Sequence, residues 1–256
     1  MVGTHAHEDH IGGLPGALSF AEAGQVLCPV TDYDSEAFRD FARLAELKGG
    51  GLIVPSVGDE YALGGATVRI LGLNAGEDTN DSSILLKVTH GEISFLFTGD
   101  AERAAEQAVL DSGAELAATV LKVGHHGSES SSCYRWLRAV QPEYAVIQVG
   151  EGNSYDHPHE PVLSRLRDAD AVVYRTDLQG HILCRSDGKT VSFETDKSAP
   201  VTNPTERPEI FVGNVKSKKF HLESCSGLPE EKNRIIFERY ADAEAAGYTP
   251  CSRCIG

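Results

Sequence analysis

The stretch THAHEDHIGG, residues 4–13, holds three histidines and two acidic side chains in six consecutive positions. His5 and His7 are two residues apart, so on an extended segment their side chains share a face and can hold one ion. Asp9 and His10 fall just before two glycines, where a turn can direct them to a second ion. Imidazole and carboxylate together suit zinc, manganese or iron. The stretch therefore predicts a metal site; a polar tail with chance histidines is the alternative.

Three later segments carry the same residue types. FTGD ends a predicted strand at Asp100, LKVGHHGS contains His125 and His126, and NSYDHPH contains His157. Clustered histidines, with cysteines crowded near the end of the chain, indicate metal binding more than a disulfide framework.

Around these segments, strand-like and helix-like runs alternate over the first 195 residues, which indicates a layered α/β fold. Runs rich in Val, Ile and Leu predict strands at residues 26–30, 68–71, 84–88, 94–97, 119–123, 144–149 and 171–174. Helical spacing predicts helices at residues 35–48, 102–111, 133–140 and 161–168. Hairpins are expected with turns at His90-Gly91 and at Asp187-Gly188.

THAHEDHIGG resembles the HxHxDH signature of the metallo-β-lactamase-fold hydrolases, and the later segments follow in the order that this family uses. LKVGHHGS, together with NDSS at residues 80–83, is similar to the branch that contains the hydrolase domain of ComEC-type competence proteins. The resemblance covers about residues 1–195 and implies an αββα sandwich. Because the family normally carries further strands before HxHxDH, the expected sandwich is N-terminally truncated.

The resemblance also implies two divalent ions, zinc or manganese, with a hydroxide held between them as the nucleophile. The expected ligands of the first ion are His5, His7 and Asp100. The expected ligands of the second ion are Asp9, His10, Asp100 and His126.

Within the His125-His126 pair, we choose His126 as the ligand because it directly precedes Gly127, where the backbone can approach most easily. His125 then contacts the substrate or supports a ligand. His157 protonates the leaving group, binds a phosphate oxygen or caps loop backbone. The expected catalytic residues are Asp9, His125 and His157.

A second constellation, His221-x3-Cys225 and Cys251-x2-Cys254, lies near the C-terminus. The roughly fifty residues after the predicted linker are too few for a comfortable core, and a Cys3His set fits a closed structural zinc site. A disulfide would leave one odd thiol and no role for the histidine.

The surrounding sequence is similar to the metal-binding domain of Ada-type DNA-repair proteins over residues 210–256. That family begins its ligand set with a methyl-accepting cysteine, whereas this chain has His221, as in Ada-like modules appended to bacterial nucleases. Lys216, Lys218 and Lys219 are candidate phosphate contacts, with a solvated basic face as the alternative. We expect a hydrolase domain at residues 1–195, a proline-rich linker at 196–208 and the zinc-binding domain at 209–256.

Net charge and hydropathy bear on two further classes of function, non-specific nucleic-acid binding and membrane insertion. The 256 residues carry a net charge of −15, and eight basic and eight acidic residues follow position 205, so the acidic excess lies in residues 1–205. This argues against broad non-specific nucleic-acid binding. No apolar run approaches the roughly 20 residues of a membrane helix, so we expect no direct membrane insertion by this chain.

The leading hypothesis is a metal-dependent hydrolase of phosphodiester bonds, with DNA as the favoured substrate, as in a ComEC-like nuclease. A second hypothesis keeps the site but takes a phosphocholine ester or other small ester, which an aromatic cage from Tyr33, Trp136 and Tyr155 would indicate. A third is an inactive truncated domain that binds nucleic acid or the envelope. Because relatives are often exported or membrane-linked, we expect a bacterial envelope or extracellular location.

Overall fold

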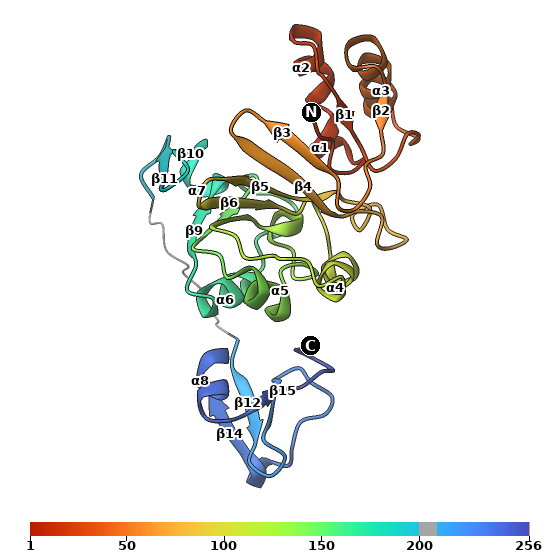
Figure 1. Cartoon of the computed structure of the whole chain (residues 1–256). Coiled ribbons are helices and arrows are strands. Elements are labelled where there is room, and N and C mark those ends of the chain that lie inside the picture. Colours follow the sequence, from red (N-terminus) through yellow and green to blue (C-terminus); the bar gives the residue numbers. More distant parts are fainter. Residues whose placement is uncertain (200–208, 256) are drawn as a thin grey trace.

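A computed structural model describes residues 1–199 and 209–255 of the chain (Figure 1). Its centre is a mixed seven-stranded sheet in the order β3-β4-β5-β6-β7-β8-β9. The strands are β3 (Glu60–Leu63), β4 (Ala66–Gly72), β5 (Leu85–His90), β6 (Ile93–Phe97), β7 (Val120–Lys122), β8 (Tyr144–Ile147) and β9 (Val172–Arg175). Strands β3 to β6 pair antiparallel and β6 to β9 pair parallel, so the carboxyl ends of β6, β7 and β8 meet at one edge.

Three helices cover one face of this sheet (Figure 1). They are α4 (Arg103–Asp111), α5 (Tyr134–Val140) and α6 (Glu160–Asp168). Their apolar sides pack with Leu96, Leu121 and Ala145 of the sheet around the fully buried ring of Trp136. Burial of a large side chain of this kind contributes about 3 kcal/mol, so this layer holds the sheet edge in place.

The other face carries a second, short sheet, in which β1 (Val26–Leu27) pairs in parallel with β2 (Leu52–Ile53). Successive residues of β1 point to opposite sides: Val26 packs with Phe38 of α3 (Glu36–Gly49), and Leu27 packs with Ile70 of β4. The order of layers is therefore helix, short sheet, large sheet, helices. This confirms the predicted αββα sandwich with a reduced first sheet.

A hairpin covers another part of that face. It consists of β10 (Ile182–Ser186) and β11 (Val191–Thr195), and follows the short helix α7 (Thr176–Gln179). The ring of Phe193 stacks on Tyr174 of β9 with centroids 4.2 Å apart, and lies 4.9 Å from the ring of Tyr144 on β8. Both predicted hairpins, this one and β5–β6, are confirmed.

The predicted helices are confirmed, and the strand bounds agree within two residues except at the first strand. That strand ends at Leu27 instead of residue 30, because Pro29 has no N–H to continue the pairing. The turn expected at Gly12-Gly13 is present, and it separates two short helices, α1 (Glu8–Ile11) and α2 (Leu14–Phe20). Ile11 N donates to His7 O at 3.1 Å, so Asp9 and His10 belong to a helical turn.

The C-terminal module is a four-stranded sheet in the order β14-β12-β13-β15 with one helix. Its elements are β12 (Phe211–Asn214), β13 (Lys219–Leu222), the 3₁₀ turn η2 (Glu231–Asn233), β14 (Arg234–Phe237), α8 (Tyr240–Ala245) and β15 (Thr249–Pro250). Its core of Phe211, Phe220 and Tyr240 continues onto Tyr134 of α5. The predicted linker at 196–208 lies mostly outside the described residues. Among the described helices, none is long and apolar enough to cross a membrane.

Candidate metal centre

The predicted ligands gather at the edge where parallel strands end. Asp100 follows β6, and the 3₁₀ turn η1 (Gly124–Gly127), which carries His125 and His126, follows β7. Helix α1 brings Asp9 and His10 to the same place from the other layer. Neighbouring parallel strands present their carboxyl ends together, which explains how Asp100 and His126, 26 residues apart in the chain, meet here.

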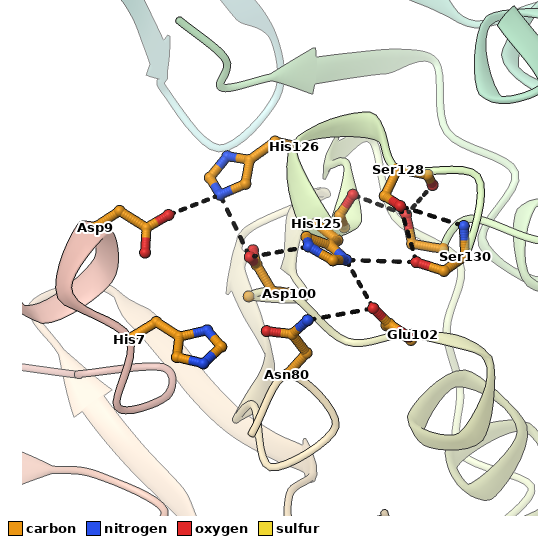
Figure 2. A network of polar contacts seen from close by, with 12 residues as sticks. His7, Asp9, Asn80, Asp100, Glu102, His125, His126, Ser128 and Ser130 are labelled. Carbon is orange, nitrogen blue, oxygen red and sulfur yellow. Dashed lines mark hydrogen bonds and ion pairs between the residues drawn. The ribbon is translucent and has the colours of Figure 1, made fainter. Parts of the chain in front are cut away.

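Four side chains form one compact group: the ligand atoms of Asp9, His10, Asp100 and His126 all lie within 4.8 Å of one another. His126 Nε2 is 3.2 Å from Asp9 Oδ2 and 3.3 Å from Asp100 Oδ2, and both contacts are drawn in Figure 2. His10 Nε2 is 3.2 Å from Asp100 Oδ1. Two imidazoles and two carboxylates at such separations are a donor set that a single divalent ion fits.

Asp100 itself shows that the group suits a cation. The residue is 3% exposed, and within the described residues its Oδ1 has no partner in hydrogen-bonding geometry. Burial would raise the pKa of this carboxyl, but the contacts with His10 and His126 and the charge of Lys122 outweigh burial and hold the pKa well below its usual range. Asp100 is therefore a buried anion with a lone pair left over, which a bound cation satisfies.

The two remaining predicted ligands lie beside this group. His5 Nε2 is 3.2 Å from His7 Nδ1 and 4.0 Å from Asp100 Oδ2. Ser83 Oγ is 3.3 Å from His5 Nδ1 and accepts the Asp100 N–H at 3.0 Å, so one hydroxyl ties both residues together. Burial, together with the nearby His10, lowers the pKa of His5 to about 3, so its ring is neutral near pH 7 and available to a metal.

His125 is held differently from its neighbour. His125 and His126 both have left-handed backbone, with φ of 44° and 53°, a conformation that costs non-glycine residues energy and often marks functional sites. This turn sends the two rings apart. His125 Nδ1 lies 2.8 Å from Glu102 Oε1, while its Nε2 lies 4.0 Å from Asp100 Oδ2 (Figure 2).

Glu102, Ser83 and Lys122 reach the centre although the sequence reasoning assigned them no role. Glu102 also accepts a hydrogen bond from Asn80 Nδ2 at 3.2 Å. Lys122 Nζ donates to Gly99 O at 2.8 Å and lies 3.7 Å from Asp100 Oδ1. Their positions in the sequence could have indicated them. Ser83 and Lys122 belong to the motif segments NDSS and LKVGHHGS, and Glu102 lies two residues after Asp100.

His157 lies in the wall of an open cavity of 610 Å³ that also exposes Asp9, His10 and His126. Its ring meets that of His125 edge-on with centroids 5.6 Å apart. Burial, with the neighbouring His159, lowers the pKa of His157 to about 4, so the ring is neutral near pH 7 and can donate a hydrogen bond to an anionic oxygen.

The C-terminal module brings its four predicted ligands together as well. The ligand atoms of His221, Cys225, Cys251 and Cys254 lie within 4.8 Å of one another, and Cys225 Sγ is 3.4 Å from His221 Nδ1. Among the described residues none of these thiols is in a disulfide. Three sulfurs and one nitrogen leave no open position in a tetrahedral zinc site.

The predicted basic contacts lie on that module, away from the metal centre. The module packs against α5 and α6, whereas α1 lies on the other side of the large sheet (Figure 1). Lys216 and Lys219 are exposed, but the Lys218 ammonium lies 4.5 Å from the ring centroid of Tyr248. The structure therefore does not place these lysines together with the catalytic candidates.

Comparison with known proteins agrees with both parts of the chain. The C-terminal segment, residues 201–255, matches the family described as metal binding domain of Ada. ComE operon protein 3 of Bacillus subtilis is 31% identical over 210 residues, which are 80% of this chain and 27% of that protein. Competence protein ComA of Neisseria gonorrhoeae is 42% identical over 104 residues, 40% of this chain and 15% of that protein. The chain thus spans about a quarter or less of the length of these relatives.

Among solved structures, the metallo-beta-lactamase fold protein YhfI from Bacillus subtilis is 14% identical, with a TM-score of 0.43 over 68% of this chain and 72% of that one. The family described as metallo-beta-lactamase superfamily matches residues 2–151, more than half of the chain. The chain belongs to the metallo-beta-lactamase superfamily and carries a C-terminal metal-binding module of the Ada type.

Proposed function

We propose that this protein is a metal-dependent phosphodiesterase whose substrate is DNA. The observation that carries the proposal is the compact group of Asp9, His10, Asp100 and His126 in an open cavity. A carboxylate shared between two groups of histidines is the arrangement that two-metal hydrolases use to act on phosphate esters.

The residues would divide the work as follows. Asp9, His10 and His126 would hold one divalent ion and His5 and His7 the other, with Asp100 reaching both. The chemistry that such ions supply is activation of water and neutralisation of charge on the phosphate. His157, neutral and facing the same cavity, would hold a phosphate oxygen or donate a proton to the leaving oxygen.

Other features of the chain favour DNA over a choline ester. Of the three aromatic residues that would form a choline cage, Trp136 is fully buried in the core behind the sheet. Tyr33 packs between Phe38 and His7, with ring centroids 6.0 and 6.4 Å away, and of the three aromatic residues Tyr155 alone lines the cavity. The name of one relative, competence protein ComA, also supports a nucleic-acid substrate. The expected bacterial envelope or extracellular location remains part of the proposal.

The test is hydrolysis of bis(p-nitrophenyl) phosphate by the full chain with added Mn²⁺ or Zn²⁺. We compare the wild type with Asp100→Ala, and with Asp34→Asn as a control because the Asp34 side chain is fully exposed. Elemental analysis of each protein gives its metal content. Turnover that is lost in Asp100→Ala and kept in Asp34→Asn supports the proposal, and cleavage of a labelled oligonucleotide then tests DNA.

Absence of turnover in wild-type protein that binds its metals fully would overturn the phosphodiesterase proposal in favour of a special ester substrate. Failure of residues 1–195 to bind ions would favour the third hypothesis, in which the domain is an inactive binding module. The metal measurement therefore separates these two outcomes.

A further inference from the structure

The loop between β8 and α6 is built around one side chain. Asn153 Nδ2 donates to Gly150 O at 3.1 Å and to His157 O at 2.7 Å. Its Oδ1 accepts the N–H groups of Tyr155 and His157 at 3.1 and 3.0 Å. Four hydrogen bonds made by one amide hold the backbone on both sides of Tyr155, so this residue keeps its place in the loop without a ligand.

The ring of Tyr155 is fixed but not buried. It stacks on the ring of His157 with centroids 5.7 Å apart and an interplanar angle of 24°. His157 in turn rests edge-on against His125. Tyr155 is nevertheless 73% exposed, and within the described residues its hydroxyl makes no hydrogen bond. The Tyr155 ring therefore contacts His157 on one side and is otherwise open to solvent. Such a ring contributes little to the core, so its position needs another explanation.

The location of the ring supplies one. Tyr155 and His157 line the same cavity as Asp9, His10 and His126. A phosphate held at the metal centre brings the rest of its substrate along this wall. Base–aromatic stacking is a common way for proteins to hold single strands, because every base has a π-face.

We propose that Tyr155 is the stacking platform for the nucleobase next to the scissile phosphate, which makes an unpaired nucleic-acid strand the substrate. This inference rests on the proposed phosphodiesterase function. In a duplex both faces of an internal base are covered by its neighbours, so only unpaired or terminal bases are free to stack on Tyr155. A choline cation would need several converging rings, and this cavity offers one exposed aromatic side chain among the residues that line it.

The experiment compares two substrates with equal numbers of phosphates: a short oligothymidylate and a strand of the same length made of abasic sites. The variants are Tyr155→Ala, Tyr155→Trp and Phe20→Ala, a control that removes a 95% exposed ring from α2, outside the cavity. We expect Tyr155→Ala to lower kcat/KM on oligothymidylate about ten- to a hundredfold. Tyr155→Ala should leave kcat/KM on the abasic strand unchanged. Tyr155→Trp should restore kcat/KM on oligothymidylate, and Phe20→Ala should change neither value.

An equal loss on both strands, or no loss on either, would overturn the proposal. Selective loss of p-nitrophenyl phosphorylcholine hydrolysis, with oligothymidylate cleavage intact, would overturn it in favour of a cation ligand. Fluorescence anisotropy separates this proposal from the proposed function, because it needs no turnover. If the wild type cleaves neither strand but binds labelled oligothymidylate more tightly than the abasic strand, and Tyr155→Ala does not, the platform stands and the phosphodiesterase fails. Equal binding of the two strands by the wild type would contradict the proposed stacking of a base on Tyr155.

Discussion

The ring of Tyr134 on α5 stacks on the ring of Tyr240 on α8, with centroids 5.1 Å apart and an interplanar angle of 22°. The two residues belong to the predicted hydrolase and zinc-binding domains, and both are 5% exposed. Tyr134 also donates from its hydroxyl to Glu209 Oε2 at 3.0 Å, just before β12. The zinc module thus completes its aromatic core with a residue of the other domain.

Because this core is shared, we expect the two domains to unfold together. Tyr240→Ala removes the stacked ring and should lower the free energy of unfolding of the module by about 3 kcal/mol, the usual cost of deleting a buried aromatic side chain. Denaturant unfolding can be followed by fluorescence of Trp136, the one tryptophan of the chain, and by zinc release to a chromogenic chelator. The two curves should coincide in the wild type and separate in Tyr240→Ala. Tyr240→Phe keeps the ring and serves as the control; separate curves in the wild type would contradict a shared core.

The pair Glu102 and His125 leads to a prediction about catalysis. A carboxylate that accepts from one imidazole nitrogen fixes the tautomer and the direction of the other nitrogen, and losing such a partner typically costs ten- to a hundredfold in activity or metal affinity. We expect Glu102→Ala to lower kcat on bis(p-nitrophenyl) phosphate by about that factor. Glu129→Ala removes an exposed carboxylate of a neighbouring loop and should leave kcat unchanged. Equal rates in the two variants would show that Glu102 does not position His125.

The sequence was sufficient for elements whose local signals agree. The helix at residues 36–49 begins after Ser35, whose hydroxyl accepts the Phe38 N–H at 3.1 Å, and its apolar spacing shows which side is buried. The β5–β6 hairpin was equally predictable, because Gly91 provides the positive φ of 60° that its turn needs. Strand β3 was missed because its side chains are almost all exposed and show no alternation.

The site was predictable as a set of residues but not as a set of contacts. Motif spacing identified Asp100 and the two histidines of η1, yet which of them faces which partner depends on backbone dihedrals that the spacing does not specify. Glu102, which contacts His125, also accepts a hydrogen bond from Asn80, 22 residues earlier in the chain. Asn80 lies beside Glu102 only after β5 and β6 have paired. The stacking of Tyr134 on Tyr240 joins residues more than a hundred positions apart, and no local pattern indicates such a contact.

Glu106 gives the protein a pH dependence that can be measured. This carboxyl on α4 is 1% exposed and accepts the N–H groups of Ser132 and Cys133, which joins α4 to the start of α5. Burial raises its pKa from 4.5 to about 7, against the opposing effect of those hydrogen bonds. A raised folded-state pKa means that the folded protein binds the proton more tightly than the unfolded chain. Its contribution to stability is therefore complete below about pH 4.5 and is lost as the pH rises through about 7.

Urea unfolding of the wild type and Glu106→Gln from pH 4 to pH 8 measures this contribution. The difference in free energy of unfolding between the two proteins should fall across this range by up to about 3 kcal/mol, since each pKa unit corresponds to about 1.4 kcal/mol. Comparing differences removes the constant cost of placing an amide at this position. Parallel profiles would mean that Glu106 does not titrate differently in the folded and unfolded states.

Gly127 fixes the position of His126, and its substitution should separate metal binding from folding of the zinc module. Its φ is +86°, and a Cβ there would lie 2.6 Å from Pro158 Cβ, so Gly127→Ala combines backbone strain with a collision. We expect a loss of about 1–3 kcal/mol in stability and weaker binding of the ion at His126, with the module's zinc retained. Gly150→Ala is the control, because a Cβ there meets nothing within 4 Å. Isothermal titration with Mn²⁺ gives the affinities, on proteins whose centre at His126 has been emptied while the module keeps its zinc. Unchanged Mn²⁺ affinity in Gly127→Ala would show that the position of His126 does not depend on this glycine.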